Sequence, residues 1–295
     1  MQWNELLDNY RVEGNEAQKV IMKNKEIKVA VIDMNNGAPN QGLRGIIDII
    51  SQFKEDKSVE LQHDVFDLRA KNEIPGTDYD IYISSGGPGS PLESEDEPWE
   101  NSFFSLLDDL KFYNQQHDLK KYVFLICHSF QLACRKYQLG TVAPRKSNAF
   151  GVFPVTLTEH GLQDTLFSGL PNPFYAVDSR DWQVIDPENT IVSEPGHDIL
   201  AIEKERKHID LERCIMSIRF SDEIVGTQFH PEANAAGMRG YLLNEDRKQS
   251  IITAHGEQKY EDMLHSLENP QRILLTQSLV LPNFLTTAVA ALKEA

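Results

Sequence analysis

The order of hydrophobic and polar residues predicts strands that alternate with helices in the first half of the chain. Residues 28–34, 80–84 and 122–126 are short continuous apolar runs, which are typical of strands buried on both faces. Residues 46–53 carry isoleucine and phenylalanine at helical spacing, and a second helical pattern covers residues 128–139. This alternation predicts an α/β fold with a doubly wound, mostly parallel sheet.

The helix predicted over residues 128–139 has a defined apolar face and a defined end. Its hydrophobic residues recur at i, i+3, i+4 and i+7, as Phe130, Ala133, Cys134 and Tyr137. Gly140 stands where a glycine commonly ends a helix, so it is expected to be the C-terminal cap.

Helical patterns weaken between residues 150 and 228, and short strands are predicted in their place. They are expected at residues 151–158, 174–178, 191–193, 199–203, 214–220 and 224–229. This half of the chain therefore predicts an antiparallel extension of the parallel sheet.

The pattern becomes helical again toward the C-terminus. Residues 260–267 and 273–279 fit helices, and Pro282 is expected to break the pattern before a last helix that ends near Lys293.

The changes in pattern divide the chain into three parts. Residues 1–25 are polar and predict an N-terminal arm, and residues 26–235 predict the α/β domain. Residues 236–295 predict a helical C-terminal extension, which covers the domain or forms a homodimer interface.

Composition narrows the kind of protein. The formal net charge is −16, and because phosphate binding needs a cationic surface, nucleic acid is not expected as a partner. No continuous apolar run approaches the length of a membrane helix and no signal peptide begins the chain, so no membrane association is expected. Three cysteines are too few and too irregularly spaced for a disulfide framework or a zinc site. A cytoplasmic, reduced protein is predicted.

Candidate chemistry begins with Cys127, which lies between the apolar run at 122–126 and the following helix. At this position the helix dipole and free backbone amides favour the thiolate, which is the nucleophilic form. The alternative interpretation is a small buried hydrophobic residue, as most free cysteines are. Cys134 and Cys214 are interpreted in that second way.

A loop of glycine, proline and serine follows the apolar run at 80–84. Its residues 86–89 (Gly-Gly-Pro-Gly) lack both the lysine and the spacing of nucleotide-binding loops. Glycines allow backbone N–H groups to approach an anion or an oxyanion. A plain tight turn is the alternative.

His230 and Glu232 are separated by one residue in a predicted extended segment, so their side chains leave the same face. This placement allows the carboxylate to hold the tautomer of the imidazole while the other ring nitrogen faces a nucleophile. The alternatives are an exposed edge pair and, less favoured, a metal site, because no third ligand lies at a suitable local spacing.

Taken together, these fragments resemble the class I glutamine amidotransferase family over residues 27–235. The most specific fragment is residues 226–232 (Gly-Thr-Gln-Phe-His-Pro-Glu), which is close to the C-terminal signature of the family. Residues 85–90 (Ser-Gly-Gly-Pro-Gly-Ser) are also typical. The resemblance implies a free-standing member, similar to the glutaminase domain of GMP synthase, with no cofactor and no metal.

The resemblance also implies roles for individual residues. Cys127 is the expected nucleophile, His230 the general base and acid, and Glu232 the residue that orients the imidazole. The backbone N–H groups of Gly87 and His128 are the expected oxyanion hole.

Substrate binding is implied for Gln131, Ser179 and Arg180. The family commonly has Ser-His where this chain has Ser179-Arg180, and an arginine there is expected to recruit a carboxylate, such as that of a γ-glutamyl peptide. The turn around the cysteine also departs from the family, because Leu125 and Ser129 replace its two glycines. Local repacking is therefore expected at Leu125.

The implied activity is hydrolysis of the side-chain amide of glutamine, or of a related γ-glutamyl amide, through a cysteine thioester. The ammonia is released or passed to a separate synthetase subunit. One alternative is a γ-glutamyl peptidase with the same triad, and another is a catalytically silent relative that binds a partner through its extra helices. A redox-sensing or chaperone-like domain ranks last, because such domains lack the His-Pro-Glu segment.

Overall fold

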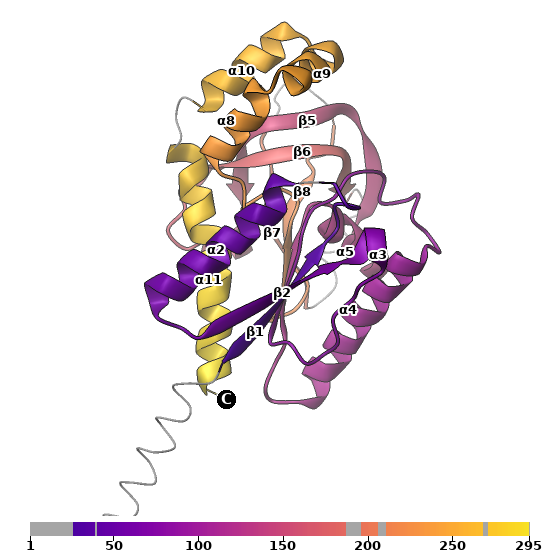
Figure 1. Ribbon diagram of the computed structural model, residues 1–295, viewed down its shortest axis with the longest axis vertical. Coiled ribbons are helices and arrows are strands. Elements are labelled where there is room, and N and C mark those ends of the chain that lie inside the picture. Colours follow the sequence, from indigo (N-terminus) through magenta and orange to yellow (C-terminus); the bar gives the residue numbers. More distant parts are fainter. Residues whose placement is uncertain (1–25, 39, 187–195, 206–210, 268–270, 295) are drawn as a thin grey trace, which may run out of the picture.

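The described residues form one nine-stranded sheet (Figure 1). The computed structural model describes residues 26–38, 40–186, 196–205, 211–267 and 271–294. In spatial order the strands are β2 (Leu61–Asp67), β1 (Ile27–Asp33), β3 (Ile81–Ser84), β4 (Tyr122–Ile126), β9 (Ile224–Thr227), β8 (Ile215–Arg219), β7 (Asp198–Glu203), β5 (Thr141–Leu157) and β6 (Phe174–Ile185). The predicted arm at residues 1–25 and the predicted strand at 191–193 lie outside the described residues.

One half of the sheet is parallel and the other half is antiparallel. Strands β2, β1, β3, β4 and β9 pair in parallel, whereas β8, β7, β5 and β6 continue the sheet through antiparallel pairs. This arrangement confirms the predicted α/β class with an antiparallel extension. The extension is larger than the short strands predicted there, because β5 and β6 are long and pair with each other along most of their length.

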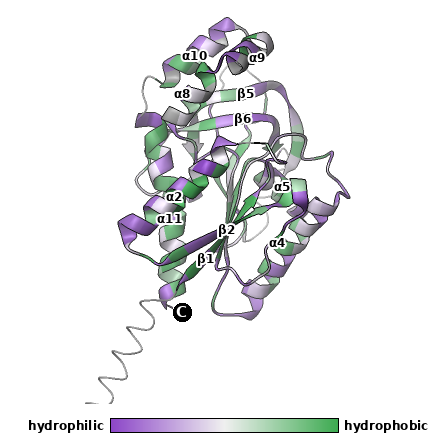
Figure 2. Cartoon of the chain, viewed as in Figure 1, coloured by the Kyte–Doolittle hydropathy of each residue, from purple (hydrophilic) through white to green (hydrophobic). Residues whose placement is uncertain are grey.

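Helices cover both faces of the parallel half (Figure 1). On one face lie α2 (Gln41–Lys57) and α11 (Gln271–Glu294), and on the other lie α4 (Pro98–Gln116) and α5 (His128–Tyr137). Strand β1 supplies both cores, because Val29 and Val31 pack with α2 while Ala30 and Ile32 pack with α4. Green and purple residues alternate around α2 and α11 in Figure 2, as expected for helices that bury one side.

A group of three helices lies over the antiparallel half (Figure 1). These are α8 (Ala235–Leu243), α9 (Glu245–His255) and α10 (Glu257–Leu267), of which only α10 was predicted as a separate helix. A small hydrophobic cluster joins them to β6 through Val177 and to α11 through Ile273. The helices therefore rest on the strand that also pairs with the segment of His230.

The long C-terminal helix corrects one prediction. Helix α11 continues through Pro282, although a proline was expected to end it. Proline removes one helical hydrogen bond, but Leu281 and Leu285 on either side are fully buried in the main core, which holds the helix together. By length and composition alone α11 is long and apolar enough to cross a membrane, although it contains no continuous apolar run of that length. In this fold 44% of its most apolar window is buried, against α2 and the sheet.

The end of α5 corrects a second prediction. Gln138, and not Gly140, is the C-cap in the left-handed conformation (φ 56°), and its N–H donates to the carbonyls of Arg135 and Cys134. Gly140 also has a positive φ, of 76°, two residues after the cap. The helix therefore ends slightly earlier than its pattern indicated.

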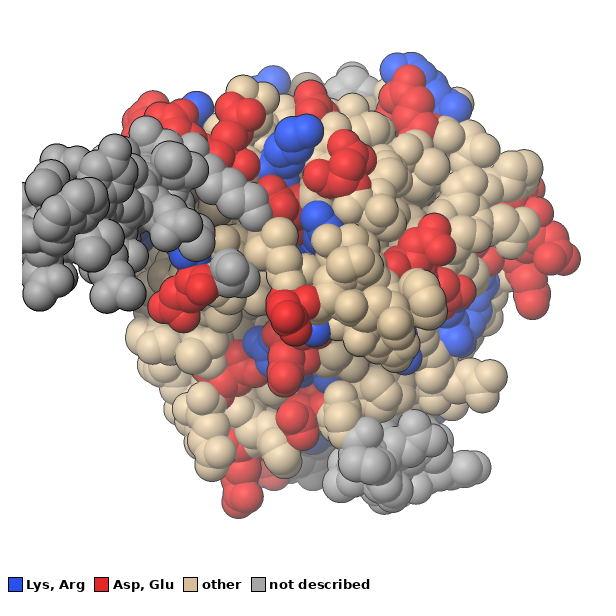
Figure 3. Space-filling model, turned by 90° about the horizontal axis from the view of Figure 1, so that it is seen from below, with Lys and Arg blue, Asp and Glu red and all other residues tan. Residues whose placement is uncertain are grey.

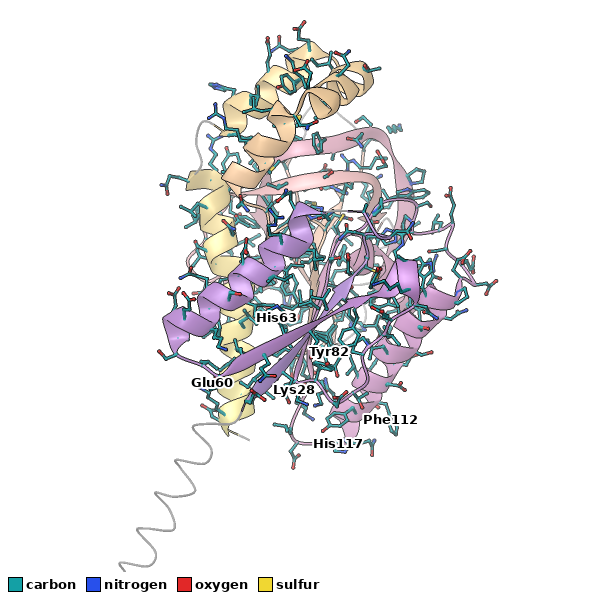
Figure 4. All side chains as sticks on the ribbon, in the orientation of Figure 1. Lys28, Glu60, His63, Tyr82, Phe112 and His117 are labelled. Carbon is teal, nitrogen blue, oxygen red and sulfur yellow. The ribbon has the colours of Figure 1, made fainter. Side chains whose placement is uncertain are left out.

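The carboxyl ends of the parallel strands meet at the edge of the sheet that carries Cys127. The opposite edge, where these strands begin, carries Lys28 and Glu60 in Figure 4, with Phe112 and His117 on the same side at the end of α4. Figure 3 views the molecule from below and shows acidic and basic side chains interspersed over that face. Ligands of parallel α/β sheets bind at the carboxyl ends of the strands, so the functional site is expected around Cys127.

Candidate active site

Cys127 occupies a sharp turn between β4 and α5. Its backbone angles are φ 50° and ψ −98°, in a region that residues other than glycine rarely adopt. Two hydrogen bonds fix the turn, from the N–H of Cys127 to the carbonyl of Thr227 (2.7 Å) and from the N–H of Gln131 to the carbonyl of Cys127 (3.0 Å). The cysteine is therefore held at the N-terminus of a helix in the geometry of a nucleophile elbow.

The two residues that depart from the family pattern are accommodated at this turn. Leu125 pairs in register with Gly226 of β9, and a Cβ on Gly226 would stand 2.8 Å from Cδ2 of Phe130 and 3.2 Å from the Cβ of Leu125. The missing side chain of Gly226 thus makes room for the leucine. The Ser129 hydroxyl accepts a hydrogen bond from the N–H of Ile126 (2.8 Å) and lies 3.0 Å from the carbonyl of Ser84, where it can donate. Ser129 therefore ties the elbow to β3.

His230 and Glu232 meet next to the cysteine. The Nδ1 atom of His230 lies 2.8 Å from Oε1 of Glu232, and the Cys127 side chain is near enough to the ring to raise the pKa of His230. Because Nδ1 is engaged by the carboxylate, Nε2 is the atom that remains for the sulfur. Glu232 is 1% exposed, and a hydrogen bond from the N–H of His230 to the carbonyl of Val177 (2.8 Å) fixes the segment against β6.

Opposing effects set the pKa of His230. Burial disfavours the charged imidazole and is the largest single effect, but the charges of Glu232 and Cys127 and their hydrogen bonds together outweigh it. The pKa of His230 is therefore raised well above 6.5. The surroundings therefore favour the charged imidazole next to the sulfur, and a cationic neighbour is the partner that stabilises a thiolate.

The glycine loop after β3 packs directly on both groups. A Cβ on Gly86 would lie 2.8 Å from Cε1 of His230 and 3.3 Å from Cβ of Cys127. A Cβ on Gly87 would lie 2.3 Å from the carbonyl oxygen of Met34, so only glycine fits there. Arg69 supports the loop, because its Nη1 lies 3.2 Å from the same Met34 oxygen and also contacts the carbonyl of Pro88.

The backbone N–H groups of Gly87 and His128 are available to a ligand. His128 begins α5, so its N–H has no partner within the helix. Within the described part of the chain, the N–H of Gly87 has no hydrogen-bond acceptor either. The side chain of His128 is buried, and burial, with the charges of Arg69 and Arg135, lowers its pKa to about 3. That imidazole is therefore neutral.

The three residues predicted to bind substrate differ in their surroundings. Ser179 is exposed, and its carbonyl oxygen lies 3.8 Å from the sulfur of Cys127. Arg180 is buried, and its Nε binds both oxygens of Asp178 at 2.8 and 3.0 Å. Gln131 is 2% exposed, and its amide is bonded within the protein. The charge of Arg180 is thus already paired, and substrate roles for the three residues stay predictions.

Two glycines of α2 that sequence reasoning missed shape the carboxylate end of the site. A Cβ on Gly42 would lie 2.8 Å from Oε1 of Glu232, and a Cβ on Gly45 would lie 2.3 Å from the backbone oxygen of Glu232. Helix α2 can approach the His230–Glu232 segment this closely only because both side chains are absent. The helical pattern predicted over residues 46–53 began after both glycines, so the sequence carried no signal that they lie inside a helix.

Gly45→Ala is expected to destabilise the protein by about 1–3 kcal/mol, because the added methyl group overlaps the backbone of Glu232. Inside a helix the same change is normally stabilising by up to about 1 kcal/mol, so the sign is diagnostic. Gly240→Ala in α8 is the matched control, because no atom lies within 4 Å of its added Cβ. Thermal unfolding of the two variants measures the difference. Equal melting temperatures would show that α2 does not press on Glu232.

The described residues contain no group of three or more histidine, cysteine, aspartate or glutamate side chains that could hold a metal ion. A cavity of about 180 Å³ lies beside Tyr122 and Arg219. Tyr122 begins β4, whereas Cys127 follows its end, so this cavity is at the opposite edge of the sheet from the candidate site.

Comparison with known proteins agrees with this geometry. The family described as Glutamine amidotransferase class-I matches residues 46–248, which include both Cys127 and the His230–Glu232 pair. The chain belongs to the class I glutamine amidotransferase family. No curated protein sequence matches the chain.

Solved structures of glutamine amidotransferases and of a glutaminase domain share the fold at low sequence identity. A glutamine amidotransferase from Thermotoga maritima is 16% identical, with a TM-score of 0.62 over 90% of this chain and 98% of that one. A glutamine amidotransferase from Methylobacillus flagellatus is 14% identical (TM-score 0.58, 89% and 95% covered). The glutaminase domain of Trypanosoma brucei CTPS, solved with bound acivicin, is 10% identical (TM-score 0.53, 88% and 94% covered). These likenesses concern the fold.

Proposed function

We propose that this class I glutamine amidotransferase hydrolyses the side-chain amide of glutamine, or of a related γ-glutamyl amide, through a thioester on Cys127. The observation that supports this most is the line of Glu232, His230 and Cys127, with the imidazole between the carboxylate and the sulfur. A nucleophile, a base and a residue that orients the base form the minimal set for acyl transfer. The particular likeness to the glutaminase domain of GMP synthase stays a prediction.

In the first half of the reaction the thiolate of Cys127 attacks the amide carbon, and the amide oxygen becomes an oxyanion. The N–H groups of Gly87 and His128 receive this charge, and one such donor contributes about 3–4 kcal/mol to the transition state. The imidazolium of His230 then gives its proton to the amide nitrogen, which leaves as ammonia. The acyl group remains on the sulfur as a thioester.

In the second half His230, now neutral, accepts a proton from water, and the resulting hydroxide attacks the thioester. Collapse of the second tetrahedral intermediate expels the thiolate and leaves the imidazolium, so the resting ion pair is restored. Glu232 holds the orientation of the ring throughout and fixes the tautomer of its neutral form, because Nδ1 faces the carboxylate. The ammonia is released or passes to a separate synthetase subunit.

The two alternatives make different predictions. The γ-glutamyl peptidase rested on a free arginine at 180, but that guanidinium is paired with Asp178, so glutamine is the favoured substrate. The silent relative rested on the altered turn, but Leu125 and Ser129 both fit there. Comparing the turnover of glutamine with that of γ-glutamyl dipeptides distinguishes the proposed glutaminase from the peptidase.

Alkylation by a glutamine-derived chloroketone is expected to add one covalent label per chain at Cys127, and Cys127→Ser is expected to lose it completely. Intact mass followed by peptide mapping measures both. Cys134→Ser is the matched control, because Cys134 is fully buried, so this variant should keep the label. A label that remains after Cys127→Ser would remove the nucleophile from this proposal. A well-folded protein that takes up no label would favour the silent relative.

A further inference from the structure

A glutamine from the family signature touches the sulfur of Cys127. The side-chain Nε2 of Gln228 lies 3.5 Å from Sγ of Cys127, within hydrogen-bond distance for sulfur. Gln228 is fully buried, so this amide is shielded from water. Behind it lies Gln131, whose Nε2 is 3.0 Å from Oε1 of Gln228. The sulfur therefore ends a short chain of amide groups that begins on α5.

The backbone carbonyl of Trp182 determines which way both amides point. A carbonyl oxygen only accepts hydrogen bonds, so the atom of Gln131 that faces it at 3.3 Å must be the NH₂ group. The second hydrogen of that NH₂ group points to Gln228, whose facing atom must then be its oxygen. The NH₂ group of Gln228 is left to face the sulfur. A donor toward the sulfur favours the thiolate over the thiol.

We propose that Gln228 stabilises the thiolate of Cys127 by donating an amide hydrogen bond to the sulfur, and that Gln131 is a positioning residue that orients this amide. The inference deepens the proposed function and rests on it for its catalytic meaning. It assigns Gln131 a role inside the protein, where 2% exposure and two internal bonds place it, instead of contact with the substrate.

A substitution of Gln228 leaves the charged residues around the sulfur unchanged. His230 is the ionisable side chain that contacts the sulfur, with Glu232 behind it, and His128 on α5 is neutral. On β6, on either side of Ser179, Arg180 and Asp178 are paired with each other. A change in the pH profile of a Gln228 variant therefore reports the lost amide contact.

The test follows the rate of Cys127 alkylation by iodoacetamide against pH, with peptide mapping to assign the labelled cysteine. A hydrogen bond to a charged group contributes about 1.5–3 kcal/mol, so Gln228→Met is expected to move the midpoint of this profile up by about one to two pH units. Gln228→Glu should move it further, because a carboxylate then faces the thiolate. Gln131→Met should produce a smaller shift in the same direction.

Gln183→Met is the control, because Gln183 is also a glutamine next to a cysteine, but its Oε1 accepts from the thiol of Cys214 (2.9 Å) and it donates nothing to Cys127. Its profile for Cys127 should equal that of the wild type. Unchanged profiles in Gln228→Met and Gln228→Glu, or a shift in Gln183→Met as large as theirs, would overturn the inference. If Gln228→Met does not fold, Gln228→Glu and Gln131→Met still test the order of the shifts. Iodoacetamide needs no glutamine site, so a failure here with intact ammonia release leaves the proposed function standing.

Discussion

His230→Ala is expected to lower kcat for ammonia release from glutamine by about 10⁴-fold. General acid–base catalysis by one residue contributes about 10²–10⁴-fold, and the upper end applies because His230 serves both halves of the reaction. It protonates the leaving nitrogen and then deprotonates the water. The raised pKa of His230 makes it an acid first, so loss of the ring stops the reaction before the thioester forms. Steady-state assays with a coupled ammonia readout measure the effect.

His160→Ala is the matched control for this variant. His160 is also a histidine beside a carboxylate, with Nδ1 3.0 Å from Asp198, but its side chain is 65% exposed and away from the elbow. The control should keep wild-type kcat, because exposed ion pairs contribute little. Alkylation of Cys127 in His230→Ala at high pH should persist, which separates lost catalysis from lost structure. A kcat within tenfold of the wild type would exclude His230 as the acid and base.

The parts of this site that the sequence predicted are those encoded in short contiguous segments. Strand β4 has the predicted bounds, residues 122–126, because five buried apolar residues in a row leave little choice of structure. Cys127 follows from the end of that strand, and the pair of His230 and Glu232 follows from the period of an extended chain. Each placement depended on neighbours within a few residues.

The features that sequence reasoning missed depend on contacts between distant segments. Gly45 contacts the backbone of Glu232 across the molecule, and Gly226 makes room for Leu125 across a strand pair. Neither partner can be identified from local spacing. The pairing of Arg180 with Asp178 was different, because residues two apart on a strand share a face and the signal was present.

Pro282 shows why a local rule can give the wrong element. A proline inside a helix carries a local energetic penalty, and the sequence predicted a break on that ground. The burial that offsets the penalty comes from distant segments, namely η1 (Thr165–Phe167), β6 and α2. Leu281 and Leu285 would lose that burial if the helix ended at the proline. A tertiary contact thus overrides a strong local preference, as it also does at the strained backbone of Cys127.

Glu232→Gln is expected to lower kcat by about 10²-fold or more, because the amide no longer favours the imidazolium and no longer fixes one tautomer. It should also change how stability depends on pH. The pKa of His230 is raised in the folded state, so protonation of His230 stabilises the fold. That contribution is fully present below the unfolded value of about 6.5 and is lost as the pH rises through the raised folded value. The melting temperature of the wild type should therefore exceed that of the variant most near pH 6, and the two should converge in alkaline buffer.

Glu60→Gln is the control, because this substitution also removes one negative charge. Glu60 is exposed and lies at the amino ends of the parallel strands, opposite the candidate site (Figure 4). Its melting temperature should follow the wild type at every pH. Burial is the largest effect on His230 and acts to lower its pKa, so removing the carboxylate leaves burial opposed only by the sulfur. The ring of Glu232→Gln should then hold its proton less firmly than in the wild type, and the C2 proton resonance of His230 should titrate at lower pH. A resonance that titrates at the same pH in both proteins would mean that Glu232 does not hold the imidazolium, and that the carboxylate only positions the ring.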